Sequence, residues 1–493
     1  KRSRGSFFDA AKRSYREKQT EKILESRRVD LGKDGIGKLV ARLAIPAVVA
    51  QLINLLYNLV DRMYVGAIDG IGTQALAGLG VVFPITIIVS AFANLVGMGG
   101  PPLASIFSGE GKKEEAGRVF NTGTVMLAVF GAALTVVVLT LCDPLVKLFG
   151  APDDAYGYAR DYLFVYGAGT VFVMFSLGLN PFISAQGYGF TAMATVAIGA
   201  VLNIALDPLF IFAFGMGVKG AALATVLSQA VSAVWVTAFF FRKSSSYRFG
   251  FKTFRPSGKF AARIAFLGFS PFIMSVTESA IQIVFNNNIT KWSNGDSDYT
   301  AALTVMLSAI QIASMPLSGL GNGVQPIVSY NYGRGDSARI KKTVKIVSVA
   351  ALCFSSAVWA VSVAAPRLYC YIFSAEPEVA AIVERYMPYF MAGTIFYFAQ
   401  MCLQNVFVAL DQAAISIFLA CLRKVILLIP LCFLLPYEFG VAGVYYSEGI
   451  ADVTAGIVTA TTFYAMLPRI LKKRENKLAA QSAAEKESED TSS

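Results

Sequence analysis

The sequence predicts an all-α integral membrane protein, with twelve transmembrane helices in two six-helix lobes related by a pseudo-twofold axis along the membrane normal. Of its 493 residues, 55% are hydrophobic and only 15% are charged, too few charges to cover a soluble globule of this size. The apolar residues also form runs long enough for a helix to cross a hydrocarbon layer of ~30 Å. In addition, the chain repeats its own pattern at a fixed separation.

The apolar runs follow one another along the chain with only short turns between them. They are apolar on all sides, and their turns contain Gly, Asn, Asp and Pro, a pattern that favours helices over the alternating strands of a membrane barrel. We therefore expect twelve spans, at residues 39–65, 76–106, 116–141, 159–184, 190–213, 219–241, 264–289, 301–328, 343–365, 384–410, 413–436 and 441–467.

The positive charges lie mainly in three segments outside these spans: the N-terminal tail (1–38), the loop 242–263 and the C-terminal tail (468–493). By the positive-inside rule, this asymmetry places both termini and the loop in the cytoplasm of a multi-pass cell-membrane protein. The first ~38 residues lack an apolar stretch with a small-residue cleavage site, so we expect no signal peptide. The net charge of +11 would also suit a nucleic-acid partner. Its confinement to these segments instead predicts membrane lipid and no nucleic acid.

An internal repeat organises the chain. Six identities between segments 96–111 and 320–335 share one separation of 224 residues, as for Gly97 and Gly321 (321 − 97). The two copies correspond to a first lobe at 39–241 and a second lobe at 264–467. An even number of helices in each copy gives both the same orientation. Transporters commonly place their substrate path between such repeats. Because one chain contains both lobes, we expect it to work as a monomer.

Two acids within the apolar spans of the first lobe are candidate cation ligands. An ionised carboxylate is costly in hydrocarbon, so Asp61 and Asp207 are functional candidates by default. Asn203 precedes Asp207 by one helical turn on the same face, and Thr225 of the next span returns to a similar depth. The chain has no histidine, so proton chemistry would depend on carboxylates. Their oxygens would equally suit Na⁺.

The repeat relates these acids to apolar positions in the second copy. At the separation of 224 residues, Asp207 corresponds to Leu431, and Asp61 to Phe285, which precedes Asn286. We therefore expect the buried acids of a cation site in the first lobe only. A second-lobe or substrate site is a further possibility, with the candidates Glu278, Asn286, Gln404, Asp411 and Arg423.

Several of these candidates allow a simpler interpretation. Asp61 could lie at a helix end beside Arg62, and Asp411 could be a solvated turn residue. Arg423 could extend toward the cytoplasm instead of facing a cavity. Glu278 is a mid-span acid that could contact a cationic substrate.

The sequence resembles the multidrug and toxic-compound extrusion (MATE) family, in its bacterial MepA-like branch, over residues 36–468. The resemblance rests on the first-span pattern at 58–66 (NLVDRMYVG) and on the glycines at 97–99 and 109–111. Above all it rests on 202–212 (LNIALDPLFIF), which is followed by 215–222 (GMGVKGAA).

The resemblance implies a V-shaped pair of lobes that exchanges a drug for H⁺ or Na⁺, with no cofactor besides the coupling ion and no metal other than Na⁺ at its site. It also implies a first-lobe cation site formed by the five residues Asp61, Asn180, Asn203, Asp207 and Thr225. Some members of the family instead use a second-lobe Glu and Asp, near which Glu278 and Asp411 fall.

These observations predict a secondary active antiporter that exports small organic, often cationic, molecules by alternating access. A flippase for lipid-linked or other amphipathic substrates is an alternative, although resembling flippases have about fourteen helices and a cationic cavity. We expect no enzyme, because the chain has no phosphate-binding loop, no histidine-based metal motif and no Gly-x-Ser-x-Gly elbow.

Overall fold

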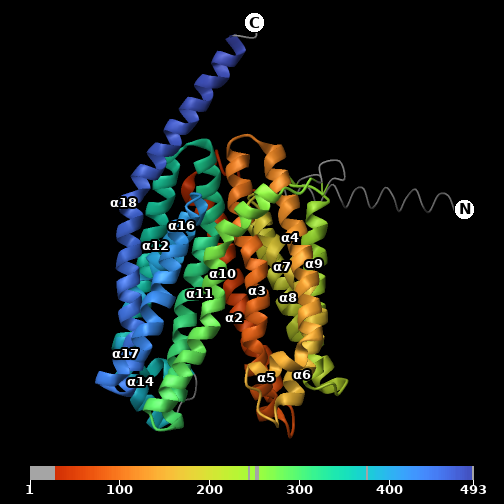
Figure 1. The fold of residues 1–493 in the computed structure, drawn as a ribbon, viewed down its shortest axis with the longest axis vertical. Helices are drawn as coiled ribbons and strands as arrows, with labels where there is room; N and C mark the ends of the chain where they lie inside the picture. The colour runs from red at the N-terminus through yellow and green to blue at the C-terminus, as the bar shows by residue number, and fades with distance from the viewer. Residues whose placement is uncertain (1–27, 243–244, 250–254, 373–375, 491–493) are drawn as a thin grey trace, which may run out of the picture.

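The computed structural model describes residues 28–242, 245–249, 255–372 and 376–490. All regular structure in these residues is helical. Figure 1 shows the long helices side by side in two bundles, with α2 to α9 on one side and α10 to α18 on the other. The predicted all-α membrane fold is therefore confirmed.

The first bundle consists of long apolar helices, with one short helix (α5) and one helix that is broken in two (α6 and α7). Glycines in the left-handed region, such as Gly111 and Gly187, form the turns after α3 and α7, where other residues would be strained. The elements are α2 (Ile36–Gly66), α3 (Gly72–Gly109), α4 (Lys113–Thr140), α5 (Cys142–Leu148), α6 (Tyr156–Ala168), α7 (Thr170–Ser184), α8 (Gly189–Pro208), η1 (Leu209–Ala213) and α9 (Val218–Phe240).

The second bundle has a similar order but more irregular helices. Its elements are α10 (Gly258–Trp292), α11 (Ser297–Arg334), α12 (Ser337–Ala364), α13 (Arg367–Ile372), α14 (Pro377–Phe390), η2 (Ala392–Phe396), η3 (Phe398–Leu403), α15 (Gln404–Ala409), α16 (Ala413–Cys421), η4 (Leu422–Leu428), α17 (Ile429–Phe439) and α18 (Val441–Asp490). Of these, η3 and η4 are π-helical segments. Such segments are rare and often mark functional sites.

Ten helices in the described residues are long and apolar enough to cross a membrane, and two bent helix pairs bring the number to twelve. The bends are 59° between α6 and α7 and 41° before η3. They fall in the predicted fourth and tenth spans, which the repeat relates to each other. Gly169 and Gly393 lie at repeat-related positions beside these bends, and each allows close contact with a neighbouring helix, Gly169 with Val226 and Gly393 with Asp452.

Glycines on the pseudo-twofold axis show how the two bundles meet. A Cβ at Gly109 would lie 2.0 Å from the Tyr330 carbonyl oxygen, and a Cβ at Gly333 would lie 2.1 Å from that of Ile106. Gly109 corresponds to Gly333, and Ile106 to Tyr330, at the separation of 224 residues. Equivalent residues therefore touch reciprocally, as they do across a twofold axis.

Two further helix pairs repeat this relation. Gly99 of α3 packs on Gly268 of α10, and the equivalent Gly323 of α11 packs on Ala44 of α2. All these glycine contacts lie in the half of the molecule where α2 begins and α18 ends (Figure 1). Small residues let helix backbones approach closely in membranes, so the bundles are joined most tightly at this end.

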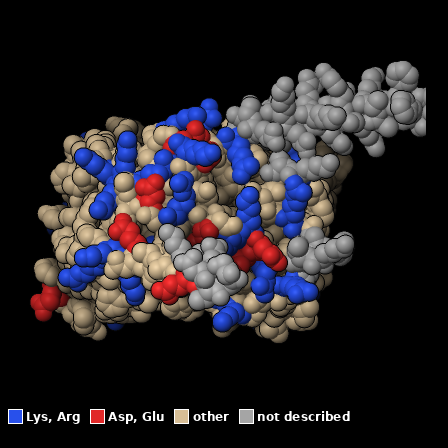
Figure 2. Space-filling view, turned by 90° about the horizontal axis from the view of Figure 1, so that it is seen from above, with Lys and Arg blue, Asp and Glu red and all other residues tan. Residues whose placement is uncertain are grey.

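An ion pair between the bundles reinforces the same end. Arg474 of α18 donates to the Glu110 Oε1 at 2.6 Å and to the carbonyl oxygens of Tyr332 and Gly333 at 2.9 Å. Burial raises the pKa of Glu110, but the hydrogen bonds from Lys112 and Arg474 outweigh this effect, and the pKa of Glu110 is lowered. Figure 2, which views this end from above, shows that many Lys and Arg side chains gather there.

Candidate cation site

Asp207 occupies a break in the helix that carries it. It is the penultimate residue of α8 and has no exposed surface. The next residue, Pro208, has no backbone N–H, and the chain continues as the π-helical turn η1, which is wider than an α-helix. The site residue therefore lies where regular helix geometry ends.

The structure brings Asn203, Asp207 and Thr225 together. The Asn203 amide nitrogen donates to the Asp207 Oδ1 at 3.2 Å and lies 3.3 Å from the Thr225 Oγ1, and all three side chains are buried. Asn203 lies one turn before Asp207 on α8, and Thr225 comes from the adjacent α9. One amide thus holds a carboxylate of its own helix beside a hydroxyl of the next.

Asp61 approaches this group from α2, which packs against α8. Tyr57, one helical turn before Asp61 on α2, lines the same cavity as Asn203 and Thr225. The neighbouring Arg62 packs over the ring of Phe83, with 4.6 Å from the guanidinium carbon to the ring centre. Within the described residues, neither acid forms an ion pair. The packed helices α2 and α8 thus each carry a carboxyl group without an ion-pair partner among the described residues.

Unpartnered oxygens are the most informative feature of this group. The Asp61 Oδ1, Asn180 Oδ1, Asn203 Oδ1 and Asp207 Oδ2 are all buried, and no described residue donates a hydrogen bond to them. Buried polar atoms are normally satisfied, so each such atom requires an explanation. Carboxylate and amide oxygens are ligands suited to a hard cation such as Na⁺, and a carboxylate oxygen can also take up a proton.

A cavity of about 320 Å³ adjoins this group, and Asn180, Asn203, Thr225 and Tyr57 contribute to its wall. Asn180 comes from α7, and its amide nitrogen donates to the Ala192 carbonyl oxygen at 3.1 Å, which leaves its Oδ1 free. No contact in the described residues joins Asn180 directly to Asp207. Asn203, Asp207 and Thr225 thus form one compact group, with Asp61 on the adjoining α2 and Asn180 further along the same cavity.

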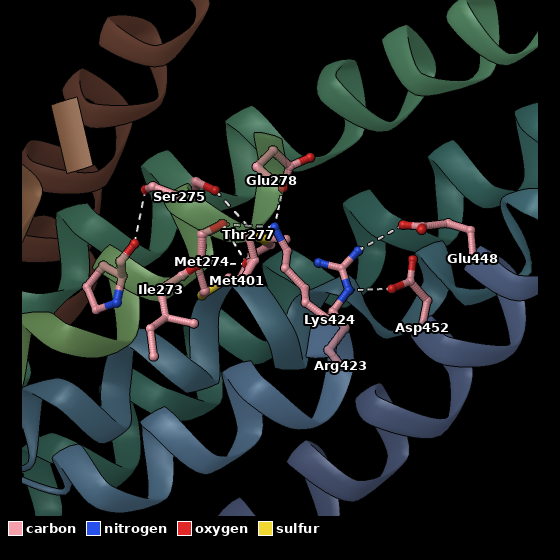
Figure 3. Close-up of polar contacts among 12 residues, drawn as sticks. Ile273, Met274, Ser275, Thr277, Glu278, Met401, Arg423, Lys424, Glu448 and Asp452 are labelled. Atoms are coloured by element: carbon pink, nitrogen blue, oxygen red, sulfur yellow. Dashed lines mark hydrogen bonds and ion pairs between the residues drawn. The ribbon is translucent and has the colours of Figure 1, made fainter. Parts of the chain in front are cut away.

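The second-lobe candidates are distributed over separate places. Figure 3 shows Glu278 of α10 in an ion pair with Lys424, and Arg423 in ion pairs with Glu448 and Asp452 of α18. Arg423 therefore faces buried acids, and the interpretation that it extends toward the cytoplasm is wrong.

The other candidates lie in different surroundings. Gln404 is buried and donates to the Ser270 Oγ at 3.3 Å and to the Ser416 carbonyl oxygen at 3.1 Å, which ties α15 to α10 and α16. Asn286 is exposed on α10. Asp411 lies in the turn between α15 and α16, with a φ of +60°, and pairs with Arg263 at 2.5 Å. The structure does not bring these three residues together with Glu278.

The sequence candidates in the second lobe include the mid-span acid Glu278 but miss two buried acids of the same lobe. Glu448 and Asp452 of α18 are 4% and 1% exposed. The repeat misled the prediction because it tested only the positions equivalent to Asp61 and Asp207. A search for every acid within an apolar span would have found both residues in the predicted span 441–467.

Comparisons with known proteins agree with this fold and its repeat. The family model MatE matches the chain twice, over residues 46–209 and 271–434. The chain belongs to the MatE family. The two matched ranges are equally long and fall one in each bundle, so the family's own pattern follows the internal repeat. The resemblance to the MATE family that the sequence motifs indicated is confirmed.

Individual members of the MatE family match along most of their length. The chain is 24% identical to the multidrug export protein MepA of Staphylococcus haemolyticus, over 89% of this chain and 95% of that protein. It is 31% identical to the MATE multidrug transporter DinF-BH, solved in complex with rhodamine 6G, with a TM-score of 0.82 over 89% of this chain and 98% of that one. An outward-facing multidrug resistance MATE transporter shares the fold at 22% identity, with a TM-score of 0.82 over 91% and 98% of the two chains.

Proposed function

We propose that this MatE-family protein is a secondary active antiporter that exports small organic cations in exchange for H⁺ or Na⁺. The single observation that supports this function most strongly is the group of buried, unpartnered oxygens around Asp207 at the wall of a cavity. Such a group is costly unless a cation neutralises it for part of the working cycle. Relatives named as multidrug exporters, one of them solved with rhodamine 6G, support export of small organic molecules.

The cavity has the size and character for a drug-sized molecule. Its volume of about 320 Å³ lies in the usual range of small-molecule sites. Tyr57, Met98 and Met193 give it aromatic and adaptable apolar surface, and the amides of Asn94 and Gln229 give it polar contacts. Its described lining contains no Lys or Arg, so nothing there would pair with the pyrophosphate of a lipid-linked sugar. The lining thus favours an exporter over a flippase.

Coupling follows if the ion and the substrate bias the same equilibrium between two packings of the lobes. With Asp61 and Asp207 ionised, the first lobe attracts an organic cation. When a proton or Na⁺ neutralises the acids from outside, that attraction disappears and the substrate leaves. A monovalent ion moving down its gradient supplies ~2.3 kcal/mol per 100 mV of membrane potential.

The orientation follows from the charges. The end of the molecule where α2 begins and α18 ends is rich in Lys and Arg (Figure 2), so in this proposal it faces the cytoplasm. The bundles are joined most tightly at this end through Gly109 and Gly333. This arrangement corresponds to a transporter that is closed toward the cytoplasm.

The test is export of rhodamine 6G by everted membrane vesicles, driven first by an imposed pH gradient and then by an imposed Na⁺ gradient. We expect one of these gradients to drive dye uptake into the vesicles and the other to have little effect, which also identifies the coupling ion. Equal uptake with and without either gradient would refute the antiporter.

A further inference from the structure

The second lobe contains a network of five charged side chains, four of them buried and Glu278 half-exposed, that the first-lobe mechanism does not use. Its members come from three helices: Glu278 from α10, Lys424 and Arg423 from η4, and Glu448 and Asp452 from α18 (Figure 3). Three carboxyl groups thus face two basic groups, the Arg423 guanidinium and the Lys424 amine. If every group were ionised, the network would carry one unbalanced negative charge inside the apolar bundle, which is costly.

At the inner end of the network, around Arg423, the hydrogen bonds show which carboxyl group lacks a full set of partners. The Arg423 Nε donates to the Asp452 Oδ1 at 2.5 Å, and the Tyr397 hydroxyl donates to the Asp452 Oδ2 at 2.8 Å, so both oxygens of Asp452 are used. Glu448 receives only the longer contact of 3.3 Å from the Arg423 Nη2 to its Oε1. Its Oε2 is buried, and no described residue donates to it.

The outer end of the network lies on α10, between the two bundles. The Glu278 side chain is 48% exposed, whereas that of its partner Lys424 is only 6% exposed. The Lys424 ammonium also donates to the Met274 carbonyl oxygen at 3.0 Å. An arriving molecule can therefore reach Glu278 without first reaching Lys424.

The π-helical geometry of η4 connects the two ends. Arg423 and Lys424 are consecutive residues, yet Arg423 binds α18 and Lys424 binds α10. Any shift of the η4 backbone thus moves both cations together. Gly393 supports the arrangement from the other side, because a Cβ added there would lie 2.1 Å from the Cβ of Asp452.

We propose that Glu448 is a proton-binding site of the second lobe, and that it exchanges its proton when an organic cation binds at Glu278. A proton on Glu448 removes the excess charge and leaves Asp452 and Glu278 paired with Arg423 and Lys424. A metal ion fits less well there, because the Arg423 guanidinium lies against the same carboxyl group and would repel it.

The exchange follows from charge balance. A cation that pairs with Glu278 releases Lys424, whose positive charge then acts on Glu448. The Glu448 O–H bond breaks, the proton leaves to solvent, and the carboxylate that remains pairs with the released ammonium. The other charged or titratable groups that face Glu448 are Arg423 and Asp452, the Tyr397 phenol and the Cys432 thiol of α17.

This inference rests on the proposed export function and adds a second ion site to it. The test is the number of protons released when rhodamine 6G binds to the purified full-length protein in weakly buffered detergent solution, followed with a pH-sensitive dye. We expect Glu448→Gln to release about one proton fewer per bound dye than the unmodified protein. Asp452→Asn also removes the excess negative charge, and it should lose the same proton while keeping an amide oxygen for Arg423.

The matched control is Glu438→Gln, which changes an exposed acid at the end of α17 and should leave the proton count unchanged. The inference would be overturned if Glu448→Gln and Asp452→Asn both released as many protons per bound dye as the unmodified protein. So would an unmodified protein that releases no proton on dye binding, a result that needs no variant. Neither result would affect gradient-driven export in vesicles, whereas loss of that export in the unmodified protein would refute the proposed function itself.

Discussion

The two lobes share a fold and a repeat, but they treat their buried acids in opposite ways. In the first lobe, Asp61 and Asp207 have no ion pair within the described residues, and each has one buried oxygen without a partner. Asn203, which donates to Asp207, lines a cavity. In the second lobe, Asp452 is fixed by Arg423 and Tyr397, and Glu278 is held by Lys424. A buried acid without a fixed counter-charge is available to a mobile cation, whereas Asp452, with both oxygens bonded, mainly supports the structure. The half-exposed Glu278 can exchange Lys424 for another cation. Glu448 is intermediate, because one of its oxygens contacts Arg423 and the other has no partner among the described residues.

The largest effect should come from removing the free charge of the first lobe. Asp207→Asn keeps the shape of the side chain but cannot bind a coupling cation by charge, so rhodamine 6G export should fall on the order of 100-fold, the upper range of coupling between two ligands. Transport into everted vesicles measures this loss. The matched control is Asp69→Asn, which changes an exposed acid after α2 and should transport normally. Normal export by Asp207→Asn would exclude the first-lobe site.

Thermal stability should show the opposite difference between the lobes, with a loss in the second-lobe variant and none in the first-lobe variant. Arg423→Ala leaves Asp452 and Glu448 as buried acids without their cation, which costs about 3–5 kcal/mol in comparable cases. Its thermal unfolding midpoint in detergent should therefore fall well below that of the unmodified protein, while Asp207→Asn, which removes an unpaired charge, should not lower it. If both variants lost the same stability, the difference between the lobes would be refuted.

A smaller effect is expected at the amide that positions Asp207. Asn203→Ala removes the hydrogen bonds at 3.2 and 3.3 Å that join Asp207 to Thr225. The change also removes the unpartnered Asn203 Oδ1, an oxygen suited to Na⁺, so a Na⁺-coupled protein should bind its ion roughly tenfold more weakly. A carboxylate that loses a hydrogen-bond donor holds a proton more tightly, so a proton-coupled protein should show the opposite shift. The concentration of ion that gives half-maximal export measures this change, and Asn287→Ala, an exposed change on α10, should leave it unaltered.

The smallest effect should come from the ion pair that joins the bundles, and it depends on pH. Because the pKa of Glu110 is lowered from 4.5, its pairing with Arg474 stabilises the fold fully above about pH 4.5 and is lost as the pH falls through the lowered value. Unfolding midpoints measured from pH 7 to pH 3 should show an advantage over Glu110→Gln, on the order of 1 kcal/mol, only in the upper part of this range. An advantage that is constant with pH would contradict this assignment.

The sequence was informative where the signal is local or repeated. Long apolar runs predicted the spans, because a helix must satisfy its own backbone in lipid. The repeated glycines around Gly109 and Gly333 predicted the twofold relation, since close helix contact requires small residues at both equivalent positions. Asn203 and Asp207 could be grouped because one helical turn separates them.

The second-lobe network could not be predicted in the same way. Lys424 pairs with an acid 146 positions earlier in the chain, and Arg423 with acids 25 and 29 positions later. No helical period relates such partners. Their directions also depend on the π-helical form of η4, and the apolar pattern of this segment does not distinguish it from an ordinary α-helix.

The most direct test of the central idea is cation binding to the purified protein without substrate, measured as proton uptake and as binding of radioactive Na⁺, in the unmodified chain and in Asp207→Asn. Our account predicts that one of the two ions binds to the unmodified protein, that rhodamine 6G displaces it, and that Asp207→Asn lacks this binding. Equal binding by both proteins would show that the free oxygens around Asp207 do not hold the coupling ion.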